Sequence, residues 1–406
     1  MGLVIQKYGG TSVESLEKIV NVAEKVIEKK ESGNDIVVVI SAMGNETDRL
    51  LSYAYKFTKQ PNSRELDMLI STGEQQAGAL LSIVLNSKGV DTISLTGHQI
   101  GIITDNNFKN AKILKINELK LREHLNKGRV VVVAGFQGVN QFEEITTLGR
   151  GGSDTTAVAL GAILKADICE IYTDVEGIYS LDPELDSESP KFKTLTYDEL
   201  LEITFSGAKV VHPRAAELAK KFNIPLIIKS SFTSDTGTII VKDADGLDRE
   251  EIYAITLHKK EVRVIFDDIK FKNSFSEFLN DLRKHGIIIE NITYEVLGER
   301  PHVTIILENI IWEKLKEKLE SNELDISFSK YIEEVDISTL TIHGIGISIE
   351  KEIFNEVLNI LRSKQVNILS INKESKKLEI IISSGNSEEI VKLINRKLNI
   401  KDGPKN

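Results

Sequence analysis

Short apolar runs, most of them followed by small or polar residues, constrain the fold of this 406-residue chain more than any other feature. The clearest are residues 3–6, 36–40, 130–133, 168–172 and 225–228. Because they do not alternate with polar residues, they predict strands buried on both faces, and the periodic segments between them predict helices. We therefore expect an α/β fold over the first two-thirds, a mostly parallel sheet sandwiched by helices. Ligands of such sheets bind beyond the carboxyl ends of the strands, where the small polar residues lie.

The composition argues against several classes of protein. Acidic residues outnumber basic ones by 61 to 51, a net charge of −10, which speaks against nonspecific binding of nucleic acid or an anionic membrane. The single cysteine, Cys169, lies in an apolar run and predicts a core residue in a reducing compartment. No Cys/His set has zinc-site spacing, and no apolar run is long enough to span a bilayer. We expect a cytoplasmic protein without a signal peptide.

A glycine-rich turn, KYGGTS at residues 7–12, follows the first strand. Thr11 and Glu14 have the spacing of a capping box, which predicts that the next helix begins near Thr11. Unpaired amides of residues 9–11 at that helix start would bind an anion, with Lys7 as the neutralising cation. The alternative is an ordinary strand–turn–helix connection, and the spacing of a Walker A loop is absent.

Two further segments supply charged side chains. Residues 65–84 predict a helix in which Glu74 stands among apolar and small residues, where a carboxylate needs a cation unless it faces solvent. Residues 146–161 predict a second glycine turn before a buried helix. In that turn Arg150 can hold a carboxylate through two hydrogen bonds, and Asp154 can either orient a reacting group or cap the helix.

A third polar segment, TDVEGIYSLDP at residues 173–183, follows the strand predicted at 168–172. Its acidic residues, glycine turn and tyrosine suit the base and ribose of a nucleotide, or a magnesium contact. A polar surface turn would have a similar composition, so both interpretations stay open.

After residue 246 the composition shifts toward Lys, Glu, Ile and Asn, and an internal repeat appears. Residues 275–293 align without gaps on residues 354–372, with matches at Phe, Leu and Ile positions. Each copy lies between two β-prone runs. The repeat predicts two small α+β units of the same build, with duplicated structural padding as the alternative.

Taken together, these segments resemble the aspartokinases of the amino-acid kinase family over nearly the whole chain. The matching stretches are KYGGTSV at 7–13, VVVISAMGNETDRLL at 37–51, STGEQ at 71–75, VAGFQG at 133–138, TTLGRGGSDTTA at 146–157, TDVEGIYSLDP at 173–183 and GAKVVHPRA at 207–215. TTLGRGGSDTTA together with STGE is specific to aspartokinases, whereas KYGGTS is shared more widely.

The resemblance implies roles for individual residues. Lys7 and Asp154 match the catalytic positions, with Lys7 contacting the transferring phosphates and Asp154 organising Lys7 and the phosphoryl group. The implied aspartate-binding set is Thr47, Glu74, Arg150 and Ser153, in which Glu74 takes the ammonium and Arg150 a carboxylate. The implied ATP-binding positions are Lys7, Gly9, Gly10, Ser12, Ser41, Thr173, Asp174, Tyr179, Asp182 and Lys209.

The implied reaction is phosphorylation of the β-carboxylate of L-aspartate by MgATP, the first step of lysine, threonine and methionine biosynthesis. Because a carboxylate is already ionised near pH 7, positioning and charge neutralisation suffice. The ATP phosphates are expected to hold Mg²⁺, with no protein metal site. Two positions at which the family pattern implies a nucleotide contact depart from it: Glu184 replaces an arginine that usually follows Asp-Pro, and Phe232 stands where some members have lysine.

The resemblance also divides the chain. Residues 1–246 are assigned to the amino-acid kinase domain, and residues 260–335 and 338–402 to two ferredoxin-like ACT domains, the second with an extra strand at 252–257. ACT domains of this family bind amino-acid effectors and mediate assembly. We therefore expect feedback inhibition by lysine, threonine or both, with lysine favoured, and a homodimer or tetramer formed through the ACT domains.

Two alternative functions stay open. A kinase for another acidic amino acid, such as glutamate or N-acetylglutamate, would share the fold, but an N-acetyl substrate has no ammonium for Glu74. A catalytically weak or dead amino-acid sensor would keep the ACT domains, but has no reason to retain Lys7, Glu74, Arg150 and Asp154 together.

Overall fold

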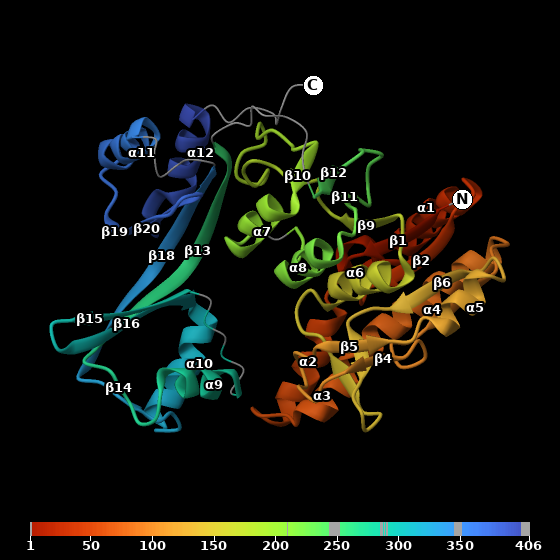
Figure 1. Cartoon of the computed structure of the whole chain (residues 1–406), viewed down its shortest axis with the longest axis horizontal. Coiled ribbons are helices and arrows are strands. Elements are labelled where there is room, and N and C mark those ends of the chain that lie inside the picture. The colour runs from red at the N-terminus through yellow and green to blue at the C-terminus, as the bar shows by residue number, and fades with distance from the viewer. Residues whose placement is uncertain are drawn as a thin grey trace. The chain divides into compact units, whose positions relative to one another are not determined.

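The computed structural model describes residues 2–208, 210–242, 252–284, 287, 289, 291–344 and 351–398. These residues fall into two compact units (Figure 1). Within the described part, the first unit comprises residues 2–180 and 190–242, and the second comprises residues 181–189 and everything from residue 252 onward. The chain thus leaves the first unit at Leu181 and returns to it at Pro190.

The first unit is built on an eight-stranded sheet with the order β10-β12-β11-β9-β1-β2-β6-β3 (Figure 1). Its strands are β1 (Leu3–Tyr8), β2 (Asp35–Ile40), β3 (Thr92–Leu95), β6 (Val130–Ala134), β9 (Ile168–Thr173), β10 (Thr194–Thr196), β11 (Leu226–Ser230) and β12 (Thr238–Val241). All pairings among β11, β9, β1, β2, β6 and β3 are parallel, and β12 runs antiparallel to β11. The five runs singled out in the sequence are five adjacent strands, so the mostly parallel α/β fold is confirmed.

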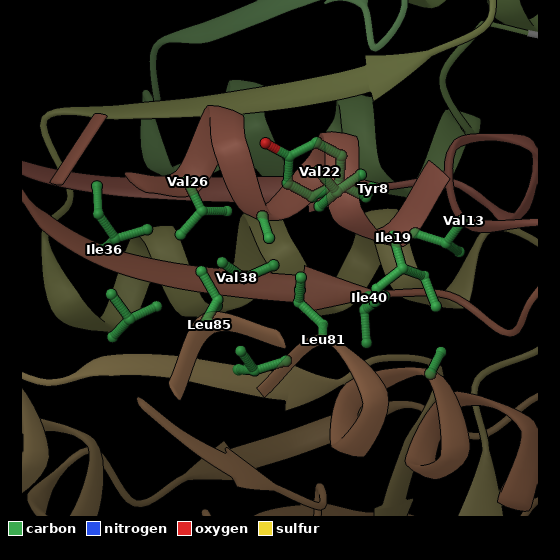
Figure 2. Close-up of a cluster of buried hydrophobic side chains, with 14 of the residues drawn as sticks. Tyr8, Val13, Ile19, Val22, Val26, Ile36, Val38, Ile40, Leu81 and Leu85 are labelled. Atoms are coloured by element: carbon green, nitrogen blue, oxygen red, sulfur yellow. The ribbon is translucent and has the colours of Figure 1, made fainter. Parts of the chain in front are cut away.

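Helices cover both faces of this sheet. The helices of the first unit are α1 (Leu16–Glu31), α2 (Glu46–Phe57), α3 (Ser63–Ile70), α4 (Thr72–Ser87), α5 (Leu119–Leu125), α6 (Gly152–Leu164), α7 (Tyr197–Phe205) and α8 (Pro213–Phe222), of which α2 and α3 lie beside the smaller sheet described below. Figure 2 shows the core on the face covered by α1 and α4, where Val38 and Ile40 of β2 pack against Ile19 of α1 and Leu81 of α4. Full burial of each such side chain stabilises the fold by about 1.5–3 kcal/mol. Because side chains alternate along a strand, Val39 points to the opposite face, toward α6.

A smaller four-stranded sheet lies in the same unit, with the order β5-β4-β7-β8. Its strands are β4 (Ile102–Thr104), β5 (Ile113–Ile116), β7 (Gln137–Val139) and β8 (Ile145–Thr147). Strand β8 ends three residues before Arg150, so this sheet sets the direction in which the chain enters the second glycine turn.

Two helix boundaries differ from the sequence prediction. A 3₁₀ helix, η1 (Gly10–Val13), follows β1, and α1 begins only at Leu16, with Ser15 as its N-cap. The capping box predicted at Thr11 is therefore wrong, because Glu14 instead pairs with Lys18 at 2.6 Å.

The single helix predicted over residues 65–84 is in fact two helices, α3 and α4, which meet at Ser71. The Ser71 carbonyl accepts a hydrogen bond from the Gln137 side chain at 2.8 Å, which holds the junction. As a result Glu74 lies in the first turn of α4 instead of the middle of a helix.

The second unit contains one six-stranded antiparallel sheet with the order β15-β16-β13-β18-β20-β19. Its strands are β13 (Ile252–Asp267), β15 (Asn291–Leu297), β16 (Arg300–Glu308), β18 (Lys330–Gly344), β19 (Ile368–Lys373) and β20 (Lys377–Ser383), and its helices are α9 (Phe275–Lys284), α10 (Asn309–Glu320), α11 (Lys351–Ser363) and α12 (Ser387–Leu398). A short two-stranded sheet, β14 (Lys270–Phe271) with β17 (Ile326–Ser327), completes it. This antiparallel α+β build is consistent with ACT-type units.

The repeat seen in the sequence corresponds to two hydrophobic cores in this unit. Phe278 and Leu282 of α9 are buried in one core, and Val357 and Leu361 of α11 occupy the matching positions in the other. The repeated apolar residues thus form the cores of two packed units, which does not support the alternative of a duplicated segment that only fills space.

Strands β13 and β18 run through both halves of the second unit. The beginning of β13, from Ile252 to Lys259, pairs with residues 338–344 of β18, whereas residues 263–267 pair with residues 330–334. The register shifts between these two stretches, at Lys259 and Glu261. Each half of the unit therefore contains a strand segment continuous with a strand of the other half.

Candidate active site

The residues proposed for catalysis meet at the carboxyl end of β1. Lys7 lies between β2 and β9, opposite Val39 and Ile171, and its Nζ is 2.7 Å from Oδ1 of Asp154. Asp154 lies in the first turn of α6, whose N-cap is Gly151, and its Oδ2 accepts the N–H of His212 at 3.3 Å. The geometry thus favours the orienting role of Asp154 over the capping alternative.

The turn after β1 is lined by close backbone contacts. The N–H of Gly9 donates to the carbonyl of Tyr172 at 3.3 Å, so the expectation of an unpaired amide is wrong for Gly9. A Cβ on Gly10 would lie 3.1 Å from the carbonyl oxygen of Ala42. The hydroxyl of Ser12 is buried and has no hydrogen-bond partner within the described chain. A glycine turn with an orphaned hydroxyl beside Lys7 fits a phosphate group.

Glu74 is a buried carboxylate at the start of α4. Its Oε1 accepts the N–H of Ala42 at 3.1 Å, whereas its Oε2 is buried without a partner in the described structure. Burial raises the pKa of this carboxyl to about 8. The glycine at position 73 lets the first turn of α4 lie close to Ala42, since a Cβ on Gly73 would lie 2.8 Å from the Cβ of Ala42. The sequence-based expectation of a buried acid that needs a cation is consistent with this arrangement.

The second glycine turn presents Arg150 to solvent. Gly149 and Gly151 have φ angles of +79° and +65°, a backbone that side chains disfavour. Arg150 is exposed, and within the described residues it forms no ion pair. Its guanidinium is therefore available to donate hydrogen bonds to the carboxylate of a ligand. Ser153, two residues beyond the turn, is buried, and only a glycine at position 135 leaves room for its hydroxyl.

The remaining substrate candidate, Thr47, is half-buried in the first turn of α2. Its neighbour Glu46 is already paired with Arg49 at 2.5 Å. The carboxyl end of β2 leads into this helix through Ser41, whose N–H donates to the carbonyl of Tyr8 at 3.1 Å.

The candidate nucleotide residues are only partly gathered in the first unit. Thr173 ends β9, and its hydroxyl donates to Asp174 at 3.0 Å, while the Tyr179 hydroxyl approaches Glu176 at 3.5 Å. Asp182 belongs to the second unit, where its Oδ1 accepts the N–H of Glu184. Lys209 lies outside the described residues.

Phe232, which departs from the family pattern, lies just beyond the end of β11. Its ring is half-exposed, and the ammonium of Lys18 lies 4.5 Å from the ring centroid. A cation therefore lies beside this position even though the residue itself is aromatic.

Two residues near the site were missed by the sequence analysis. Asp67 of α3 is buried and accepts hydrogen bonds from Thr147 and from the N–H of Lys109. Arg214 of α8 donates to the carbonyls of Leu148 and Ala111. The signal for Asp67 was available, because the acid stands among the apolar residues Leu66, Leu69 and Ile70. Arg214 follows a proline at a helix start and gives no such signal.

Comparison with known proteins places this chain in a family. Residues 2–230 match the model of the amino acid kinase family. The chain is 37% identical over 398 residues to an aspartokinase of Bacillus sp. (strain MGA3), covering 98% of this chain and 97% of that protein. The chain is an aspartokinase of the amino acid kinase family. It is also 37% identical to aspartokinase 2 of Bacillus subtilis (strain 168), over 100% of this chain and 99% of that protein.

Solved structures support the fold of this aspartokinase. The chain is similar to E. coli aspartokinase III in complex with aspartate and ADP, with a TM-score of 0.78 at 22% sequence identity, covering 98% of this chain and 100% of that one. It is also similar to the aspartate kinase of Clostridium acetobutylicum, with a TM-score of 0.71 at 22% identity and coverages of 98% and 100%. None of the helices that the structure describes is long and apolar enough to cross a membrane.

Proposed function

We propose that this aspartokinase transfers the γ-phosphoryl group of ATP to the β-carboxylate of L-aspartate at the Lys7–Asp154 pair. One carboxylate oxygen forms a bond to the γ-phosphorus while the bond from that phosphorus to the oxygen of ADP breaks, so the products are 4-phospho-L-aspartate and ADP. No proton has to move, because the nucleophile is already ionised. The buried ion pair between Lys7 and Asp154 is the observation that supports this proposal most strongly.

The substrate set follows from the charges of the side chains. The unpartnered oxygen of Glu74 would accept the ammonium of aspartate, and the exposed guanidinium of Arg150 would hold a carboxylate. Thr47 and Ser153 would add hydroxyl contacts. Lys7 would neutralise charge on the transferring phosphoryl group, while Asp154 fixes the position of its ammonium.

The nucleotide is proposed to bind along Gly9, Gly10, Ser12 and Ser41, and further along Thr173, Asp174, Tyr179 and Lys209. Within the described residues no group of three or more His, Cys, Asp or Glu side chains could hold a metal ion. A Mg²⁺ ion is proposed to enter with ATP and to neutralise phosphate charge.

The test is ADP release with MgATP and L-aspartate, run beside L-glutamate and N-acetylglutamate. Turnover with aspartate alone is expected, and the Glu74→Gln variant should lose affinity for aspartate while keeping its affinity for ATP. Comparable turnover with N-acetylglutamate would contradict the role of Glu74. Absence of turnover in folded protein that still binds an amino acid would favour the sensor alternative.

The regulatory proposal concerns the second unit. We assign residues 260–335 and 338–402 to two ACT domains that bind lysine, and we propose a cytoplasmic homodimer or tetramer assembled through them, with residues 1–246 as the catalytic domain. One related structure, E. coli aspartokinase III, is described in complex with lysine and aspartate. The effector is identified by measuring how lysine, threonine and both together inhibit ADP release. Light scattering at each effector concentration then measures the assembly state.

A further inference from the structure

Hydrogen bonds from the side chain of Arg214, a residue without an assigned role, hold the backbone of the turn that contains Arg150. Nη1 of Arg214 donates to the carbonyl of Leu148 at 3.1 Å, and Nη2 donates to the carbonyl of Ala111 at 2.8 Å. Leu148 lies two residues before Arg150. Arg214 is partly buried, which makes hydrogen bonds from its charged group strong.

Hydrogen bonds between main-chain groups hold the same turn as well. The N–H of Leu148 donates to the carbonyl of Phe136 at 2.8 Å, and the N–H of Ala111 donates to the carbonyl of Thr147 at 2.9 Å. The two carbonyls that Arg214 bridges therefore belong to two segments that already touch each other. One guanidinium joins both segments at a defined separation.

The segment that contains Arg214 also reaches the catalytic pair. The N–H of His212 donates to Oδ2 of Asp154, and the His212 side chain packs so closely on the turn that a Cβ on Gly151 would lie 2.1 Å from the Cβ of His212. His212 and Arg214, separated by Pro213, thus contact the turn on the two sides of Arg150. Proline at the first position of α8 fixes the backbone between the two contacts.

We propose that Arg214 is a positioning residue that sets the location of Arg150 and thereby the affinity for aspartate. This inference rests on the proposed role of Arg150 as a carboxylate ligand. Because Arg150 is long and exposed, the direction of its side chain depends on the backbone of the turn, and the two hydrogen bonds from Arg214 fix that backbone.

The experiment compares Arg214→Gln and Arg214→Lys with Arg150→Gln and with a matched control, Arg122→Gln. Arg122 of α5 also donates to a main-chain carbonyl, that of Leu164, but at the opposite end of α6. For each variant the KM for aspartate, the KM for MgATP, kcat and the thermal midpoint are measured.

Arg214→Gln should raise the KM for aspartate about tenfold, since hydrogen bonds from a charged group are lost. The KM for MgATP should stay within about twofold of the parent, and Arg122→Gln should leave both constants unchanged. Arg214→Lys, which can reach one of the two carbonyls, should raise the KM for aspartate by a smaller factor. The double variant of Arg150 and Arg214 should be no worse than Arg150→Gln alone, because the two residues act in series.

Equal increases in both KM values, or none in either Arg214 variant, would overturn the positioning role. If Arg214→Gln does not fold, the folded Arg214→Lys variant decides, and an unchanged KM for aspartate in it also overturns the role. If Arg150→Gln itself leaves the KM for aspartate unchanged, the proposed contact between Arg150 and the carboxylate is wrong, and the positioning role that rests on it falls too. If Arg150→Gln raises that KM but the Arg214 variants do not, only the positioning role is wrong.

Discussion

Nζ of Lys7 and Oδ1 of Asp154 lie 2.7 Å apart, and both side chains are almost completely shielded from solvent. A pair of this kind compensates two charges that would each be costly to bury alone. It also joins the end of β1 to the start of α6, two elements far apart in the sequence. The pair thus combines a stabilising role with the chemical role proposed for it.

Removing either member of this pair should stop catalysis. We expect Lys7→Ala and Asp154→Ala each to lower kcat by at least about a hundredfold, because charge neutralisation at the phosphoryl group is lost. Urea unfolding should show that the double variant is destabilised less than the sum of the single variants, since neither charge is left buried alone. Lys127→Ala, which removes an exposed pair with Glu123, serves as the control and should keep normal turnover. Near-normal rates in either single variant would remove that residue from the catalytic set.

The raised pKa of Glu74 predicts a pH-dependent affinity for aspartate. Without ligand the carboxyl is neutral below about pH 8, so binding of the ammonium must release a proton at neutral pH. The KM for aspartate should therefore fall as the pH rises from about 6 to 8, and calorimetry in buffers of different ionisation enthalpy should detect the released proton. Glu74→Gln should remove both effects. A pH-independent KM in the parent protein would contradict the assignment.

The same carboxyl should affect the stability of the unliganded protein. Its pKa rises from 4.5 to about 8 on folding, so its contribution to the free energy of unfolding is fully present below pH 4.5 and is lost as the pH rises through 8. We expect Glu74→Gln to be more stable than the parent at pH 9 and closer to it at pH 5. Urea midpoints at the two pH values measure the difference, and a constant difference would argue that Glu74 is ionised throughout.

The glycine at position 151 should be irreplaceable. Gly151→Ala combines a positive φ with a Cβ that would lie 2.1 Å from the Cβ of His212, so the turn must move. We expect kcat/KM for aspartate to fall at least about tenfold. Gly89→Ala is the matched control, because Gly89 has φ +86° but no atom within 4 Å of a new Cβ, and it should lose only about 1 kcal/mol of stability with normal kinetics. Equal effects of the two substitutions would mean that backbone strain alone is responsible.

Asp67 should be a large contributor to stability. It accepts three hydrogen bonds, from the N–H and hydroxyl of Thr147 and from the N–H of Lys109, and burial nonetheless raises its pKa. Asp67→Ala leaves buried donors without partners and should lower the free energy of unfolding by about 3 kcal/mol. Asp91→Ala, which removes a surface pair with Arg129, should cost less than about 1 kcal/mol. Urea titrations of the two variants compare them directly.

Five strands of the first unit were predictable because they are continuous apolar runs, four of which lead into small or polar residues, a pattern that depends on local sequence. The start of α1 was misplaced by the prediction, since Ser15 and Thr11 are both suitable caps and only the paired Glu14 and Lys18 distinguish them. The contacts of Asp67 and Arg214 join segments distant in the sequence, and no local pattern encodes such partners. The transfer of residues 181–189 into the second unit was unpredictable for the same reason.

The shared strands of the second unit also determine the order in which it can form during synthesis. Ile252 pairs with Gly344, so the first residues of β13 leave the ribosome about ninety residues before their partner exists. At roughly 5–20 residues per second, this is a delay of roughly 5–20 seconds. During that time an apolar segment with Ile255 and Leu257 has an unpaired edge, which is the situation in which nascent chains recruit chaperones. The half built on residues 263–334 has all of its strand partners before residue 338 is synthesised, so it can pack first, whereas the first residues of β13 must wait for the end of β18.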